Sequence, residues 1–108
     1  MTEITFYRDH EGKPIGFSAK DHTGYAEEGQ DIVCAAVSAL VINFLNSFEQ
    51  LTDDAGTHHV SEEDALISFK VSGRCSEKGQ ILLDSLVLGI TNIESEYHRY
   101  IHVVFEEV

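Results

Sequence analysis

The chain has 108 residues, which we interpret as a single domain, residues 1–108, with a core of its own. Acidic residues outnumber Lys and Arg by 19 to 7, giving a net charge of -12. This charge argues against direct nucleic-acid binding and against docking on an anionic membrane. A basic partner fits the charge, although the acidity could equally serve solubility alone.

The two cysteines, Cys34 and Cys75, are too few for a disulfide framework. We therefore expect a cytoplasmic protein. Residues 1–10 hold charges and no apolar run, so no signal peptide is expected. The longest apolar stretch, residues 32–45, is interrupted by polar residues and is shorter than a membrane span.

The first half of the chain predicts a β-hairpin followed by a helix. Residues 2–8 are rich in β-branched and aromatic residues, residues 14–20 place Ile15, Phe17 and Ala19 on one face, and turn-forming residues lie between the two runs. Residues 21–30 are polar and contain two glycines, which predicts a mobile loop. A helix should then run from about residue 31 to about residue 51.

The predicted helix is apolar nearly all the way round. A two-layer domain of this size cannot surround such a helix. We therefore expect a homodimer, with its contact around Ile42, Phe44 and Leu45.

The second half predicts a short strand at residues 58–60, a strand at 65–71, a helix at 77–97 and a strand at 100–105. Ser76 is a candidate cap for the helix. The order β-β-α-β-β-α-β predicts an α+β fold with two layers, a mostly antiparallel sheet with two helices packed on it.

Cys34 is the candidate nucleophile. If the helix begins near Asp31, the sulfur lies in the first turn, where unpaired N–H groups and the helix dipole favour a thiolate. We therefore predict a lowered Cys34 pKa and candidate oxyanion donors among nearby backbone N–H groups. His22, 12 residues earlier, is the candidate base. The alternative is that Cys34 is a small buried hydrophobe.

Residues 22–38, HTGYAEEGQDIVCAAVS, resemble the signature of the bacterial ribosomal-processing cysteine proteases, the Prp family. The matching positions are His22, Gly29, Asp31, Ile32, Val33, Cys34, Ala35 and Ser38. The chain length and element order are also similar over the whole chain. The sequence departs from the family at two positions beside His22, with Asp21 where Gly is usual and Thr23 where Ala is usual.

The resemblance implies a thiol protease in which Cys34 is the nucleophile and His22 the general base. Its substrate would be the N-terminal extension of a large-subunit ribosomal protein, cut after an aromatic residue during ribosome assembly. An alternative is a non-catalytic ribosome-assembly or peptide-binding protein of the same fold, to which the altered residues around His22 would point. A third alternative is a cysteine hydrolase of small esters or amides.

Several other residues are candidates for supporting roles. Asp31 could orient His22 or simply cap the helix. Ser38, one turn beyond Cys34, could point toward the site or bond back to a helical carbonyl. Gly24 and Gly29 should let the loop bend. No cofactor is expected, and adjacent histidines at 58 and 59 make a poor metal pair because they face opposite sides of a strand.

Overall fold

The structure, a computed structural model, describes residues 1–21 and 28–108. Within these residues the order of elements is β-β-α-β-β-α-β, as predicted. The strands are β1 (Thr2–Arg8), β2 (Pro14–Lys20), β3 (Ala55–Ser61), β4 (Leu66–Ser72) and β5 (Ile101–Glu107), and the helices are α1 (Glu28–Leu51) and α2 (Glu77–Tyr97). The predicted α+β class is confirmed.

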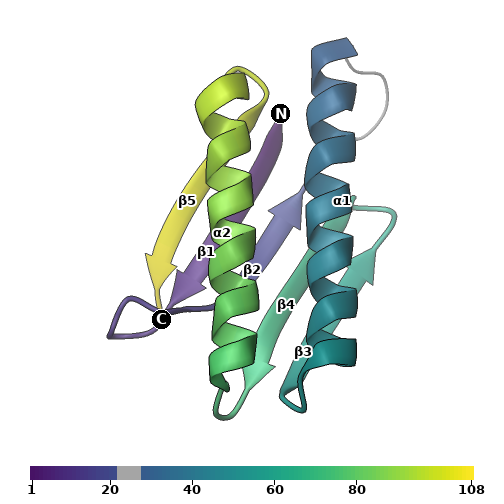
Figure 1. Ribbon diagram of the computed structural model, residues 1–108. Coiled ribbons are helices and arrows are strands. Elements are labelled where there is room, and N and C mark those ends of the chain that lie inside the picture. Colours follow the sequence, from purple (N-terminus) through teal and green to yellow (C-terminus); the bar gives the residue numbers. More distant parts are fainter. Residues whose placement is uncertain (22–27) are drawn as a thin grey trace.

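The strands form one sheet in the order β3-β4-β2-β1-β5. The pairs β1–β2, β2–β4 and β3–β4 are antiparallel, and the pair β1–β5 is parallel. Both helices lie side by side on the same face of the sheet (Figure 1). This arrangement is the predicted two-layer domain, and no helix from the described part of the chain covers the other face of the sheet.

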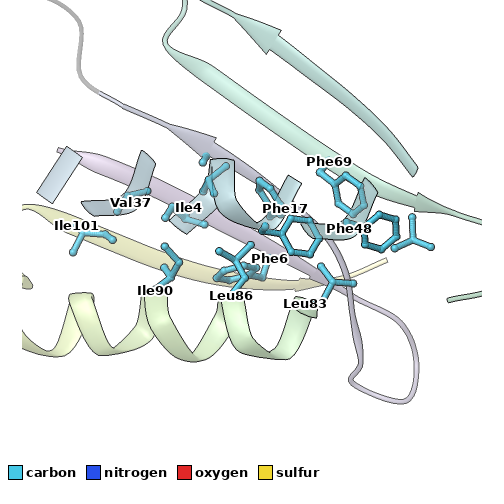
Figure 2. Close-up of a cluster of buried hydrophobic side chains, with 14 of the residues drawn as sticks. Ile4, Phe6, Phe17, Val37, Phe48, Phe69, Leu83, Leu86, Ile90 and Ile101 are labelled. Atoms are coloured by element: carbon cyan, nitrogen blue, oxygen red, sulfur yellow. The ribbon is translucent and has the colours of Figure 1, made fainter. Parts of the chain in front are cut away.

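The core lies between the helices and the sheet (Figure 2). In α1 the buried apolar residues recur every three or four positions, which places them on one helix face: Val33, Val37, Val41, Phe44 and Phe48. Phe17 of β2 and Phe69 of β4 stack with ring centroids 5.8 Å apart, and Phe44 meets Phe69 edge-on at 5.0 Å. The aromatic cluster therefore anchors α1 along the middle of the sheet.

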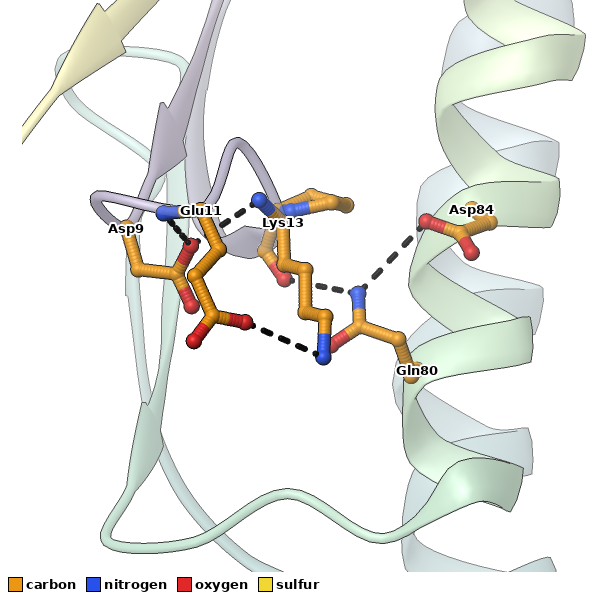
Figure 3. Close-up of polar contacts among 6 residues, drawn as sticks. Asp9, Glu11, Lys13, Gln80 and Asp84 are labelled. Atoms are coloured by element: carbon orange, nitrogen blue, oxygen red, sulfur yellow. Dashed lines mark hydrogen bonds and ion pairs between the residues drawn. The ribbon is translucent and has the colours of Figure 1, made fainter.

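The β1–β2 turn is tied to itself and to α2 (Figure 3). The carboxylate of Asp9 accepts from the backbone N–H groups of Glu11 and Lys13 at 2.9 and 3.0 Å. The side-chain amide of Gln80 donates to the Pro14 carbonyl at 3.1 Å. These bonds fix the end of the molecule where β1 and β2 meet.

Helix α1 begins at Glu28, about one turn earlier than predicted. Residues 28–30 are therefore helical, and the prediction of a loop over 21–30 is wrong for that part. Residues 22–27, the rest of the predicted loop, lie outside the described residues. Helix α2 begins where predicted, and the Ser76 hydroxyl accepts from the Gly79 N–H at 3.2 Å, as a helix cap does.

The outer side of α1 is exposed and partly apolar. Ile42 is 50% exposed, but Phe44 is only 3% exposed because it packs in the core of its own chain. Phe44 was therefore wrongly assigned to the expected dimer contact.

Helix α1, with 24 residues, is long and apolar enough to span a membrane, whereas the apolar stretch 32–45 alone is too short. Core helices of other proteins have the same length and composition, so this property is weak evidence for a membrane span.

Candidate functional site

An apolar cavity of about 280 Å³ lies beside Cys34. Helix α1 forms one wall with Cys34, Val37, Ser38 and Val41. The opposite wall comes from the end of β2 and from the β3–β4 hairpin, which contributes residues 60–62 and 65–67. The cavity therefore brings together segments that are far apart in the sequence, with the sulfur on its edge.

Cys34 lies in the second turn of α1, six residues after the helix begins. Its backbone N–H is therefore inside the helix, where it pairs with the carbonyl of Gln30 by the regular helix pattern. The prediction that the sulfur lies in the first turn is therefore wrong. The prediction of oxyanion donors among the backbone N–H groups near Cys34 stays a prediction, although the N–H of Cys34 itself is paired within the helix. The N-terminus of α1, where the helix dipole favours a thiolate, lies more than one turn before Cys34 and is too far away to stabilise a thiolate there directly.

Asp21, the residue that follows β2, lines the same cavity as Cys34, and its carboxylate acts on the Cys34 thiol through hydrogen bonding and charge, both of which raise the Cys34 pKa. The backbone N–H of Asp21 donates to the Ala65 carbonyl at 2.9 Å, which fixes it to the β3–β4 hairpin. Its Oδ1 accepts from the Thr2 hydroxyl at 2.8 Å. The carboxylate beside the sulfur is thus held from both the sheet and the hairpin.

The hydrogen bonds continue behind Asp21 into the protein interior. The side-chain amide of Gln30 donates to the Thr2 hydroxyl oxygen at 2.9 Å and to the Tyr100 carbonyl at 3.1 Å. The Thr2 N–H also donates to the Tyr100 carbonyl, at 2.9 Å. Because Thr2 is 1% exposed and Gln30 is 6% exposed, this relay is shielded from solvent, and it joins β1, α1 and the residue before β5 to the carboxylate.

The surroundings of Cys34 favour the thiol over the thiolate. The Cys34 pKa is raised from its ordinary value of 9.0 to about 11; burial is the largest cause, followed by the hydrogen bond to Asp21 and the negative charge of Asp21. A hydrogen bond from Ser38 lowers the pKa, and the charge of Asp31 raises it slightly. The prediction of a lowered pKa is therefore wrong for this arrangement.

The supporting candidates are only partly brought together. Ser38 reaches Cys34, so its hydroxyl points toward the site rather than only back to the helix. Asp31 lies inside the first turn of α1 and is not the residue before the helix, so its assignment as the cap is wrong. Its negative charge is still in a favourable position, near the positive end of the helix dipole. Gly29 is helical, and a Cβ there would lie 2.6 Å from the Tyr100 ring. Gly29 is therefore packed closely against Tyr100 within the helix, and the prediction that it lets a loop bend is wrong.

Other residues singled out in the sequence lie outside the described residues or away from the cavity. His22, Thr23 and Gly24 lie outside the described residues, so the Cys–His pair stays a prediction. Cys75 lies beyond the cavity, just before α2, with its sulfur 3.9 Å from the Asp54 carboxylate. Burial and Asp54 raise its pKa also. Within residues 1–21 and 28–108, no group of three or more His, Cys, Asp or Glu side chains could hold a metal ion.

The sequence interpretation missed Thr2 and Gln30. A signal for Gln30 was present, because it precedes Val33 by three residues and Cys34 by four, so it shares their side of the helix. A polar residue on a buried helix face requires a hydrogen-bond partner, which Thr2 and Tyr100 provide. No local pattern could indicate that the partner lies at the start of the chain.

The family model for the cysteine protease Prp matches residues 1–102. The ribosomal processing cysteine protease Prp of Bacillus subtilis is 29% identical over 107 residues, covering 95% of this chain and 96% of that protein. The protein SMU.848 of Streptococcus mutans has a similar structure, with a TM-score of 0.89, 29% identity and coverage of 100% and 99% of the two chains.

A structure of an essential ribosomal processing protease Prp from Staphylococcus aureus, in complex with a substrate peptide, also has this fold. Its TM-score is 0.92 and its identity is 22%, with coverage of 98% of this chain and 100% of that chain. At this identity the likeness concerns the fold alone. The family match and the structural likeness both extend over almost the entire chain.

Proposed function

This chain belongs to the family of Prp cysteine proteases, and we propose that it removes the N-terminal extension of a large-subunit ribosomal protein precursor during ribosome assembly. The observation that carries the proposal is the position of Cys34 on the edge of an apolar cavity, in a chain whose family match spans residues 1–102. The name of the Bacillus subtilis relative, a ribosomal processing protease, supports the choice of substrate.

In the proposed mechanism, Cys34 and His22 act as a dyad. The Cys34 sulfur attacks the carbonyl carbon of the scissile peptide bond, while the thiol proton passes to His22. His22 then gives this proton to the leaving amine as the carbon–nitrogen bond breaks. Water, deprotonated by His22, hydrolyses the resulting thioester, which releases the acid fragment and restores the thiol.

The cavity supports specificity for an aromatic residue before the cleaved bond. Its lining beside Cys34 is mainly apolar and includes Val37, Val41 and Ile67. An apolar cavity of about 150 Å³ is known to accept benzene, so a volume of about 280 Å³ has room for an aromatic ring. Apolar burial of this ring would stabilise the complex, and the sulfur would then lie near the carbonyl that follows it.

One observation favours the alternative function, a non-catalytic peptide-binding protein of the same fold. The Cys34 pKa is raised to about 11, so only a small fraction of the sulfur is a thiolate at neutral pH. The same cavity would bind a peptide without cleaving it. A binding measurement alone does not separate the two functions, whereas cleavage does.

The proposal includes two features of the protein in the cell. We place it in the cytoplasm, where ribosomes are assembled and where Cys34 and Cys75 would stay reduced; both are free thiols here. We also propose a homodimer that covers the exposed apolar side of α1, on which Ile32 and Ile42 are 54% and 50% exposed.

The direct test is cleavage of a peptide that spans the junction between extension and ribosomal protein, with the products identified by mass spectrometry. The wild-type protein should cut after the aromatic residue, and Cys34→Ala should be inactive. Cys75→Ala is the matched control, because Cys75 is also half-buried and also faces a carboxylate, and it should retain activity. Binding without cleavage by the wild-type protein would establish the alternative instead.

A further inference from the structure

Hydrogen bonds that do not involve Cys34 fix the position of Asp21. Its N–H bonds to the Ala65 carbonyl, and its Oδ1 bonds to a buried hydroxyl on Thr2. Thr2 is in turn fixed by the Gln30 amide. A carboxylate held in this way keeps its orientation toward the cavity, and moving it would break several hydrogen bonds at once.

We propose that Asp21 is a positioning residue that holds Cys34 as a protonated thiol in the substrate-free protein, through the thiol–carboxylate hydrogen bond. The resting protein is then weakly reactive toward other electrophiles in the cell. The thiol becomes a nucleophile when its hydrogen bond to Asp21 is broken or when a positive charge offsets the carboxylate. This inference rests on the proposed role of Cys34 as the nucleophile.

The charged and titratable groups around the sulfur agree with this role. Lys20, Asp21 and Glu62 line the same cavity, from the end of β2 and from the β3–β4 turn, and Asp31 acts from α1. The acidic groups outnumber the single lysine, so the surroundings disfavour a thiolate. His22 lies outside the described residues. Of the described groups, Asp21 is the one that both bonds to the thiol and repels its charged form.

Asp21→Asn separates the charge of this residue from its part in the fold. The asparagine keeps an oxygen that can accept from the Thr2 hydroxyl, and its backbone N–H can still donate to Ala65. It removes the negative charge beside Cys34 and replaces a hydrogen-bond acceptor with an amide that can donate to the sulfur. Asp53→Asn is the matched control, since it removes the same charge beyond the far end of α1, roughly 25 Å along the helix from Cys34.

The test measures the rate at which 4,4′-dithiodipyridine labels each cysteine across a pH series, without any substrate, with sites assigned by mass spectrometry. Each unit by which the Cys34 pKa falls raises the thiolate fraction at neutral pH tenfold and lowers its intrinsic nucleophilicity about threefold. Asp21→Asn should therefore label Cys34 at least about threefold faster per unit of pKa lost. Cys75 is the internal reference and should be unaffected, as should both cysteines in Asp53→Asn.

An unchanged pH profile for Cys34 in folded Asp21→Asn overturns the proposal. If that variant fails to fold, the wild-type profile decides, because the proposal requires Cys34 to titrate above the free value of about 8.5, and a lower midpoint overturns it. The test is independent of cleavage. Full cleavage by Cys34→Ala would reject the proposed function whatever the labelling shows, whereas unchanged labelling rejects only the role of Asp21.

Discussion

Replacing Thr2 by Val tests the buried hydrogen-bond relay beneath the candidate site. The substitution nearly preserves side-chain volume but removes the hydroxyl, which donates to the Asp21 carboxylate at 2.8 Å and accepts from Gln30 at 2.9 Å. Because Thr2 is 1% exposed, water does not replace these bonds easily. The Gln30 amide keeps its bond to the Tyr100 carbonyl, so only one of its bonds is lost.

The magnitude follows from the kind of bond that is lost. A hydrogen bond to a charged group contributes about 1.5–3 kcal/mol, and a second bond to a neutral amide contributes about 1 kcal/mol. The gain from burying an extra methyl group offsets roughly 1 kcal/mol of this. We therefore expect Thr2→Val to lower the free energy of unfolding by about 1.5–3 kcal/mol, which corresponds to a fall in Tm of about 10 °C for a domain of this size.

Urea denaturation followed by circular dichroism measures this loss, provided that the m-value is unchanged. Thr5→Val is the matched control, since Thr5 lies on the same strand but on its other, half-buried face, and it should change stability by less than about 0.5 kcal/mol. Thr2→Ser keeps the hydroxyl and should recover most of the stability. A Thr2→Val protein within about 0.5 kcal/mol of the wild type would show that the relay does not support the site.

Three further predictions concern pH, assembly and charge. Folding raises the Cys34 pKa from 9.0 to about 11, so the contribution of the protonated thiol to the free energy of unfolding is complete below pH 9 and is lost as pH rises toward 11. Between pH 9 and 11 the Tm of the wild type should therefore fall more steeply than the Tm of Cys34→Ala. Parallel declines in Tm would contradict the raised pKa. Light scattering should give twice the monomer mass of 12.0 kDa, and Ile42→Asp should restore the monomer; a monomeric wild type would reject the dimer. Added salt should slow cleavage of a full-length basic precursor more than that of a short extension peptide, because the net charge of -12 steers the basic substrate; equal slowing would leave the acidity as a solubility feature.

The fold could be predicted well because its signals are local and repeated. A run of β-branched and aromatic residues identified β1, and alternating apolar residues identified β2, both with their observed bounds, and the Ser76 cap identified the beginning of α2. The short strand predicted at residues 58–60 is longer in the structure, because β3 pairs with β4 along its whole length although its side chains are almost all exposed. Backbone pairing forms such an edge strand, and it leaves little pattern in the sequence.

The site could be predicted less completely, because its properties depend on contacts between distant segments. The family signature identified Cys34, but its surroundings depend on Asp21 and on where α1 begins. Taking Asp31 as the beginning of the helix placed the Cys34 sulfur in the first turn and predicted a lowered Cys34 pKa. In the structure the helix begins at Glu28, and burial and Asp21 raise the Cys34 pKa instead. The sequence did single out Asp21 as an unusual anion near the presumed base, and the structure places it against the sulfur.

The central claim, that Cys34 is the nucleophile of a peptidase, is tested most directly by partial alkylation of the wild-type protein. The occupancy of each cysteine is measured by mass spectrometry, and residual cleavage of the junction peptide is measured on the same samples. The account predicts that turnover falls in proportion to modification of Cys34 and does not depend on modification of Cys75. Full turnover by protein whose Cys34 is completely modified would contradict it.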